Sequence, residues 1–329
     1  MNRFDSEAIW RDLRQRGYCV IPNVIPDEKC DELSQELKSW ALTHDNGELF
    51  KHPYSLIDVP RIGHLEAAWK ARLLAKDAFA AVWGTEKLVS SFDKLSICPP
   101  PEISTGDFDT GFSWLHVDRG GYRRGLHAFQ GGIYLEETTE TDACLRIMEG
   151  SNNYTDEFFS THPEATKNTC DREHYRLSED EIAWYSSKGC FRKLVPAPKG
   201  SVVLWDTRTV HDNVKAKKGR PHTDRWRYVV FACMLPAIWA SDADLEFKRK
   251  AFENMSLTCH MPCVKVRTHV FSEDIPESFY AIQRMPDITK TLEVLRLVGI
   301  EKYDFNDGKP HGPTEKPKWT SENIKFYDN

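Results

Sequence analysis

The sequence predicts a mainly β protein with helical flanks, in which a sandwich or barrel of strands is braced by helices. Helical spacing of apolar residues dominates the first third of the chain, and from about residue 88 it gives way to short runs rich in β-branched and aromatic residues. Helical spacing returns after residue 236. The 329 residues are 40% hydrophobic and show neither an internal repeat nor a convincing linker, so we expect one domain with a substantial core over 1–329.

The N-terminal part, 1–87, is predicted to be mainly helical. Helical patterning covers 5–16, and a second helix over 26–44 opens at a Pro-Asp pair and has apolar residues three and four positions apart. Between these helices the strand-like run YCVIP occupies 18–22. An apolar stripe predicts a third helix over 64–83.

Six runs in the central part of the chain, 88–236, are predicted to be strands. They cover 89–97, 112–118, 127–135, 144–148, 201–210 and 227–235. The polar stretch 150–190 has no strong period, and we interpret it as an insertion that could act as a lid over a site. The C-terminal extension, 237–329, begins with a predicted helix over 241–254 and includes a Pro- and Lys-rich tail, 309–318, with little power to form a core.

Charge and composition argue against several classes of protein. The net charge of -6 comes from acids and bases mixed along the chain, so nucleic-acid binding has no clear support. No apolar run approaches the roughly 20 residues that a membrane helix needs, and the N-terminus lacks the apolar region of a secretory signal. The nine cysteines are odd in number and scattered, which favours reduced thiols and a cytoplasmic location.

Two predicted strands end in side chains of the types that bind metal ions. Alternation along 112–118 puts His116 and Asp118 on one face of a strand. The run 201–210 leads into His211, which alternation would put on one strand face with Val203 and Trp205. Two histidines and one carboxylate on one side of a metal form the facial triad of non-haem Fe(II) oxygenases and leave three coordination positions open. A 2-oxo acid can occupy two of these positions and O2 the third. We therefore predict an Fe(II) site at these three residues.

A 2-oxo acid with a second carboxylate also requires a fixed cation. Arginine is suited to this role because it is always charged and pairs with a carboxylate through two N–H groups. Arg225 and Arg227 share a face at the start of the last predicted strand; we favour Arg227, which adjoins the apolar run, and Arg225 remains open. Gln130 is a further candidate to face the co-substrate, although a polar residue on a strand is more often solvated.

A His-x-Asp tripeptide is a weak signal when it is taken alone. His116 and Asp118 could form a buried hydrogen-bonded pair, and a second copy at 222–224 lies in a polar loop, where we interpret it as part of a turn. The metal site is favoured by the order of the residues along the chain, because a strand ending in His-x-Asp is followed by a strand ending in His and then by an arginine that opens the next strand.

Two other clusters have alternative interpretations. Cys259, His260, Cys263 and His269 are of the types that bind zinc, but their spacing matches no compact zinc motif, so an ordinary buried loop is favoured. The run RGGYRR at 119–124 follows the predicted metal carboxylate and adds up to three cations there. One hypothesis is an anionic substrate, and the other is a solvated turn loosened by glycine.

Three further segments have counterparts in a known family. They are GYCVIPNVIP at 17–26, ACLRIMEGSN at 143–152 and GSVVLW at 200–205. Together with the His-x-Asp tripeptide, they resemble the phytanoyl-CoA dioxygenase-like family over 15–236. The resemblance implies a double-stranded β-helix core of the jelly-roll, cupin-like type, with Fe(II), 2-oxoglutarate and O2 as cofactor and co-substrates and with succinate and CO2 as coproducts.

The sequence departs from the family pattern at two positions. Asn152 stands where the family often has histidine, and Asn213 stands where a small hydroxyl residue often follows the distal histidine; Asn213 could still donate a hydrogen bond to the co-substrate. Related halogenases replace the metal carboxylate with Gly or Ala, whereas Asp118 is present here. Hydroxylation is therefore favoured, and desaturation or cyclisation stays open because those enzymes keep the same triad.

These observations predict an Fe(II)- and 2-oxoglutarate-dependent dioxygenase that hydroxylates an unactivated C–H bond of a small organic substrate. One alternative is a catalytically silent or regulatory metal-binding protein on the same fold. Another is a cupin-like metalloenzyme that does not use 2-oxoglutarate, which would typically have more histidines and no need of the arginine.

Overall fold

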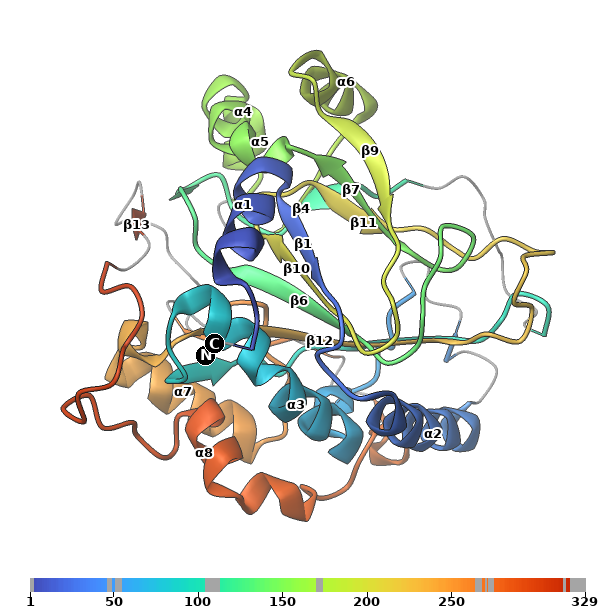
Figure 1. The fold of residues 1–329 in the computed structure, drawn as a ribbon, viewed down its shortest axis with the longest axis vertical. Helices are drawn as coiled ribbons and strands as arrows, with labels where there is room; N and C mark the ends of the chain where they lie inside the picture. The colour runs from blue at the N-terminus through green and yellow to red at the C-terminus, as the bar shows by residue number, and fades with distance from the viewer. Residues whose placement is uncertain are drawn as a thin grey trace.

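Two antiparallel sheets carry most of the strands of the central part of the chain (Figure 1). The computed structural model describes residues 3–45, 49–50, 55–103, 113–169, 174–263, 268–269, 271, 275–315 and 318–319. The first sheet has the order β1-β10-β6-β12-β2, with β3 also paired to β12: β1 (Tyr18–Ile21), β10 (Val202–Asp206), β6 (Phe129–Tyr134), β12 (Arg227–Pro236), β2 (Leu88–Ser90) and β3 (Leu95–Cys98). The second has the order β8-β4-β11-β7-β9: β8 (Tyr175–Arg176), β4 (His116–Val117), β11 (His211–Asn213), β7 (Leu145–Glu149) and β9 (Phe191–Val195). The predicted mainly β core with helical flanks is confirmed.

All three predicted N-terminal helices are present: α1 (Ser6–Arg16), α2 (Asp27–His44) and α3 (Glu66–Trp83), with a short 3-10 helix η1 (Ile62–His64) before α3. Helix α1 begins where the side chain of Asp5 accepts a hydrogen bond from the Ala8 amide, and it ends at Gly17. Gly17 has a φ of 86°, and a Cβ atom there would lie 2.5 Å from the Thr209 hydroxyl. Glycine is therefore required both by the backbone conformation and by the close approach of the chain at 209.

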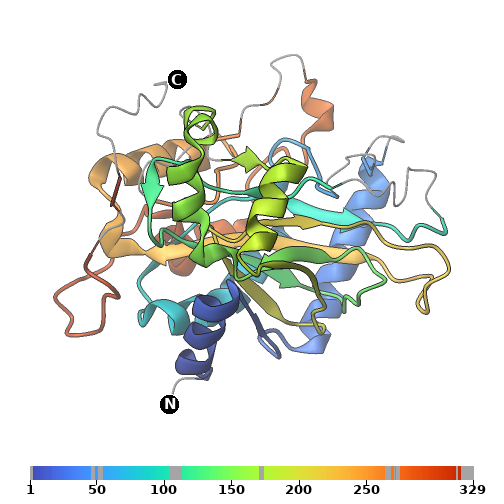
Figure 2. The ribbon, with the colours of Figure 1, turned by 90° about the horizontal axis from the view of Figure 1, so that it is seen from above.

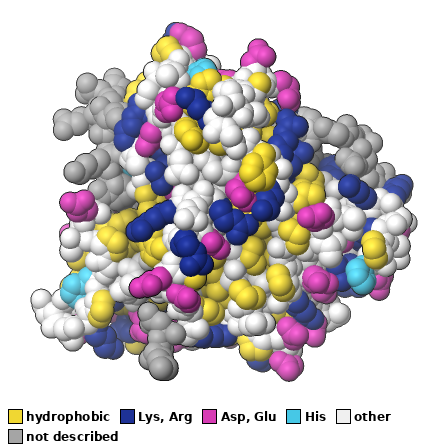
Figure 3. Space-filling model, turned by 45° about the horizontal axis from the view of Figure 1, so that its top comes forward, with side chains coloured by type: hydrophobic (Ala, Val, Ile, Leu, Met, Phe, Trp, Pro, Cys, Tyr) yellow, Lys and Arg dark blue, Asp and Glu magenta, His cyan; other side chains and the backbone are white. Residues whose placement is uncertain are grey.

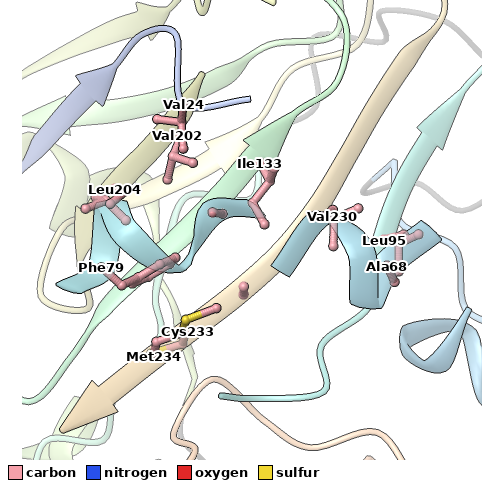
Figure 4. Packing of buried hydrophobic residues seen from close by; sticks show 14 of the residues in the cluster. Val24, Ala68, Phe79, Leu95, Ile133, Val202, Leu204, Val230, Cys233 and Met234 are labelled. Carbon is pink, nitrogen blue, oxygen red and sulfur yellow. The ribbon is translucent and has the colours of Figure 1, made fainter. Parts of the chain in front are cut away.

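The largest part of the core lies between the first sheet and the helices that cover its outer face. Phe79 of α3 packs toward Leu204, and Ala68 of the same helix lies beside Leu95 and Val230 (Figure 4). A separate cluster, which includes Tyr134, Ile147, Val203 and Trp205, draws on strands of both sheets and fills the space between them. The two sheets thus face each other across a packed interior, as expected for a jelly roll.

The chain crosses from the first sheet to the second between β10 and β11, where the sequence predicted one strand over 201–210. The Asp206 carboxylate accepts a hydrogen bond from the Arg208 amide at 2.8 Å, and the Asp206 carbonyl accepts one from the Thr209 amide at 2.8 Å. This turn ends β10 and delivers His211 to the other sheet. The expectation that His211 shares a strand face with Val203 and Trp205 is therefore wrong, because alternation does not continue through a turn.

Two other predicted strands differ in extent. The run 89–97 forms two strands, β2 and β3, that both pair with β12. In the run 112–118, β4 covers only His116–Val117, and residue 112 lies outside the described residues. The chain before β4 is held by side chains instead, since the Asp212 carboxylate accepts a hydrogen bond from the Trp114 amide at 3.1 Å.

The polar region 150–190 contains short helices that cover the outer face of the second sheet (Figure 2). They are η2 (Ser151–Asn153), α4 (Thr155–Thr161), α5 (Pro163–Lys167) and α6 (Glu179–Ser187). Phe158 and Tyr185 from these helices pack against Leu115 and Val117. The sequence does not predict these helices, because each is too short to show a clear period.

The side chain of Asn152 donates hydrogen bonds to the Leu13 and Arg14 carbonyls near the end of α1. This departure from the family pattern therefore has a structural role.

Helices of the described part of the extension pack against the helical side of the molecule (Figure 1). Its elements are η3 (Ala237–Trp239), the predicted helix α7 (Asp242–Glu253), η4 (Glu277–Phe279), η5 (Asp287–Lys290), α8 (Leu292–Val298) and β13 (Lys318–Trp319). Although the tail was expected to contribute little to a core, it is docked on the molecule. The Pro310 and Pro313 carbonyls accept hydrogen bonds from Thr85 and Trp239, and β13 pairs with β5 (Arg123–Arg124).

On the face in Figure 3, several Lys and Arg side chains gather across the middle, with Asp and Glu side chains between and around them. None of the helices within the described ranges combines the length and apolarity that a bilayer crossing requires.

A buried histidine at the junction of the N-terminal and C-terminal helices should make the stability depend on pH. Burial among Trp69, Phe92 and Phe252 lowers the pKa of His64 to about 3. In the unfolded chain the pKa is about 6.5, so between pH 6.5 and 3 only the unfolded state gains the proton. This lowers the free energy of unfolding by up to about 1.4 kcal/mol per pH unit as the pH falls.

The measurement is urea unfolding at pH 6.5 and pH 5 for the wild type and for His64→Gln, which keeps a donor for the Ser256 carbonyl. We expect the wild type to lose about 2 kcal/mol more than the variant over this interval. Equal losses in the two proteins would contradict the assignment of this pH dependence to His64.

Candidate metal centre

His116, Asp118 and His211 come together where β4 and β11 pair. His116 lies directly opposite His211 in the antiparallel register, and the centroids of the two rings are 4.3 Å apart. Asp118 follows β4 by one residue. All three side chains are buried, and their candidate ligand atoms lie within 4.8 Å of one another.

The distances between these atoms suit a metal held on one side. His116 Nε2 is 3.3 Å from Asp118 Oδ1, and His211 Nε2 is 3.3 Å from Asp118 Oδ2. Atoms bound about 2.1 Å from a metal and at right angles to each other lie roughly 3 Å apart. The geometry therefore fits a metal ion of the size that imidazole and carboxylate ligands bind.

Backbone carbonyls orient both imidazole rings. The Trp114 carbonyl lies 3.1 Å from His116 Nδ1, and the Thr209 carbonyl lies 2.9 Å from His211 Nδ1. These acceptors favour the tautomer with the proton on Nδ1, which leaves the Nε2 lone pair free to bind a metal. Burial, followed by the charge of His116, lowers the pKa of His211, so the neutral ring is favoured at neutral pH.

Asp118 remains ionised although it is buried. Burial by itself raises the pKa of this carboxyl, but His260 and His116 outweigh burial and hold the pKa well below its usual range. Gln130, on β6 of the first sheet, donates a hydrogen bond from Nε2 to Asp118 Oδ2 at 2.9 Å. The contact of Gln130 in this structure is thus with the metal-binding carboxylate, and its contact with a co-substrate stays a prediction.

Arg227, at the start of β12, is buried and surrounded by neutral acceptors. Its guanidinium donates to Ser96 Oγ at 3.0 Å, to Asn213 Oδ1 at 3.0 Å and to the Ala143 carbonyl. Among the described residues it forms no ion pair with an acidic side chain. Arg225, by contrast, pairs with Glu137 at 2.7 Å and with Asp142 at 3.2 Å, so its charge is already balanced.

Two of the cations that follow Asp118 contact other residues of the protein. Arg119 is fully buried and forms an ion pair with Asp156 at 2.9 Å. Arg123 is fully buried as well, and its guanidinium contacts His127 Nδ1 at 2.9 Å. Neither arginine belongs to the solvated turn that the sequence suggested, and the hypothesis of an anionic substrate gains no support from them.

Two histidines near the site were missed as site residues. The ring centroid of His174 lies 4.7 Å from that of His116, and His260 Nε2 lies 3.4 Å from Asp118 Oδ2. His260 attracted attention only as one of four candidate zinc ligands. Of the groups of metal-binding residue types in the described part of the chain, only His116, Asp118 and His211 form a compact cluster, so the zinc hypothesis has no structural support. No sequence spacing signals His260, because loops separate it from the other residues.

A buried site of two histidines and one carboxylate between the sheets of a jelly roll defines a metal-binding jelly-roll protein. The chain belongs to the phytanoyl-CoA dioxygenase (PhyH) family, whose sequence pattern matches residues 13–214. The predicted family resemblance is thereby confirmed. Together with the three-residue site, membership supports iron and 2-oxoglutarate as the cofactors.

Comparisons with individual proteins extend this result. The chain is 29% identical over 276 residues to "Ava biosynthesis cluster protein O" of Aspergillus versicolor, covering 77% of this chain and 85% of that protein. The structure of GlcNAc Inducible Gene 2 (GIG2) from Candida albicans superposes with a TM-score of 0.63 at 16% identity. The match covers 92% of this chain and 78% of GIG2, so the two proteins share a fold. The carbocyclase SnoK from nogalamycin biosynthesis has a TM-score of 0.46 at 16% identity, covering 70% and 83% of the two chains.

Proposed function

We propose that this protein is an Fe(II)- and 2-oxoglutarate-dependent dioxygenase that hydroxylates an unactivated C–H bond of a small organic substrate. The observation that carries the proposal is the pairing of a buried His-Asp-His cluster with a buried arginine that lacks an acidic partner among the described residues. A cation without a counter-ion is costly to bury. An anionic co-substrate would offset that cost.

Nε2 of His116, Nε2 of His211 and one carboxylate oxygen of Asp118 would hold the metal from one side. The ion and 2-oxoglutarate, when bound, supply oxidation by O2, with succinate and CO2 as coproducts. The protein keeps both rings neutral and oriented through their Nδ1 contacts, and Gln130 restrains the carboxylate. These contacts fix the three ligands before the metal binds, so little order must be gained on binding.

Arg227 would bind the distal carboxylate of 2-oxoglutarate. Asn213, which contacts Arg227, lies two residues beyond His211 on β11, roughly 7 Å along an antiparallel strand. That spacing is on the scale of a five-carbon dicarboxylate stretched between a metal and a guanidinium. Because Asn213 Oδ1 accepts from Arg227, we assign the amide nitrogen of Asn213 to hydrogen bonding with the co-substrate.

The alternatives make different use of the site. A cupin-like enzyme without 2-oxoglutarate would draw on the additional histidines, His174 and His260, and would have no role for Arg227. A catalytically silent protein would bind the metal without turnover.

The relative from a biosynthesis cluster supports a small organic molecule as the substrate. We also propose a cytoplasmic location, on the ground that the buried residues Cys19, Cys30 and Cys190 are thiols outside any disulfide.

The test is an anaerobic titration of the metal-free protein with Fe(II), followed by 2-oxoglutarate. We expect a weak visible charge-transfer band that appears only when both are present, and succinate formation after O2 is admitted. Succinate in place of 2-oxoglutarate is the control, because it lacks the keto oxygen needed for chelation. Metal binding without the band would favour the enzyme that needs no oxo acid, and a band without succinate in the presence of candidate substrates would favour the silent protein.

A further inference from the structure

One side chain of the C-terminal extension reaches the metal centre. His260 lies outside the part of the chain that the family pattern matches, and its side chain is 32% exposed. Its Nε2 atom is 3.4 Å from Asp118 Oδ2, and its Nδ1 atom is 3.4 Å from Asp93 Oδ1. The imidazole thus stands between two buried carboxylates, of which one is a proposed metal ligand.

The carboxylate on the far side of His260 is firmly held. Asp93, in the loop between β2 and β3, is buried, and its Oδ2 accepts a hydrogen bond from Ser91 Oγ at 2.5 Å. Its backbone carbonyl accepts one from the buried Arg72 at 3.2 Å. Asp93 can therefore act as a fixed support for the imidazole.

The backbone that carries His260 is anchored to the same loop. The Phe92 amide donates to Thr258 Oγ1 at 2.8 Å, and the Thr258 amide donates to the Phe92 carbonyl at 3.2 Å. Two residues earlier, the Ser256 carbonyl lies 3.0 Å from His64 Nε2. Both contacts precede His260 in the chain, and they hold its segment against the loop between β2 and β3 and against η1.

Asp118 is the ligand that most needs such support. Its Oδ1 faces His116 Nε2 and its Oδ2 faces His211 Nε2, each at 3.3 Å, and a carboxylate turns easily about its terminal bond. Gln130 approaches Oδ2 from the first sheet at 2.9 Å, and His260 approaches the same oxygen from the extension. Outer contacts of this kind orient metal ligands and commonly change metal affinity by about 10- to 100-fold.

We propose that His260 is a positioning residue of the metal centre, and that the Asp93-His260-Asp118 bridge lets the extension complete the site. The imidazole contacts the two carboxylates through its two ring nitrogens, each at 3.4 Å. The role is that of a support for a ligand, not of a ligand or a catalytic residue. The inference rests on the proposed function only in naming Asp118 as a metal ligand.

The test measures metal binding without turnover. Mn(II) is titrated into the metal-free protein, and free Mn(II) is followed by electron paramagnetic resonance, for the wild type and for His260→Ala, His260→Gln and His260→Asn. Glutamine places an N–H near the position of imidazole Nε2, and asparagine places one near Nδ1. His44→Ala is the matched control, since His44 is also half-buried but stacks on Trp40 of α2.

We expect His260→Ala to weaken Mn(II) binding by about 10- to 100-fold and His260→Gln to recover most of this loss. Mn(II) binding by His260→Asn should stay as weak as in His260→Ala. His44→Ala should bind Mn(II) as tightly as the wild type. Wild-type affinity in His260→Ala would overturn the inference and leave the metal site intact. Recovery by Asn but not by Gln would overturn it too, since the contact with Asp93 alone would then suffice. A wild type that binds no Mn(II) would instead contradict the metal site itself.

Discussion

His211→Ala is expected to abolish the visible band of the Fe(II) and 2-oxoglutarate complex and to weaken Fe(II) binding by more than about 100-fold. Loss of an outer contact already costs about 10- to 100-fold in metal affinity, and this substitution removes one of three protein ligands. It also leaves His116 and Asp118 with a cavity between the sheets. The anaerobic titration gives both the affinity and the band in one experiment.

The control for this substitution is His222→Ala, which alters the second His-x-Asp tripeptide in an exposed loop. It should leave the band and the affinity within about twofold of the wild type, because surface changes away from a site have small effects. If His211→Ala retained the band at wild-type Fe(II) concentrations, the assignment of His211 as a ligand would have to be abandoned.

The second large effect is expected for 2-oxoglutarate binding in Arg227→Leu. A buried, charged hydrogen-bonded pair loses about 3 kcal/mol or more when one partner is removed, which corresponds to a decrease in affinity of about two orders of magnitude. Arg227→Lys should fall between the wild type and Arg227→Leu, because an ammonium keeps the charge but not the two-pronged geometry. The measurement is the dissociation constant of 2-oxoglutarate, taken from the band at saturating Fe(II).

Arg225→Leu is the matched control, because Arg225 lies two residues before Arg227 and on the same predicted strand face. It breaks ion pairs with Glu137 and Asp142, so we expect lower thermal stability but 2-oxoglutarate affinity within about threefold of the wild type. The opposite pattern, with affinity lost in Arg225→Leu and kept in Arg227→Leu, would transfer the role of anchor to Arg225. Melting curves without 2-oxoglutarate separate a loss of folding from a loss of binding.

Much of the candidate site could be predicted because its residues carry local signals. His116 and Asp118 are two positions apart, and periodicity of two and of three to four residues identified the strands and most long helices. The family pattern added the fold. The short helices of 150–190 were missed, since segments of five to nine residues contain too few turns to show a period.

Contacts between distant segments were beyond the reach of local patterns. The turn at Asp206 moved His211 to the second sheet, so this candidate ligand was proposed from a strand that in fact ends before it. The choice between Arg225 and Arg227 depended on acidic partners that lie more than 80 positions away in the sequence. Strand alternation puts the two arginines on one face and cannot say which charge is balanced.

The sequence by itself thus determined the fold class, the family and the three candidate metal ligands, because each depends on residue types at fixed, short spacings. Only the tertiary structure decided which arginine has no acidic partner among the described residues, that Gln130 contacts Asp118, and that His260 and Asp93 lie behind the candidate metal carboxylate. The physical reason is that hydrogen bonds and ion pairs act over a few ångströms in space. The paths of loops and helices determine which residues come that close, and these paths do not appear as a repeating pattern in the sequence.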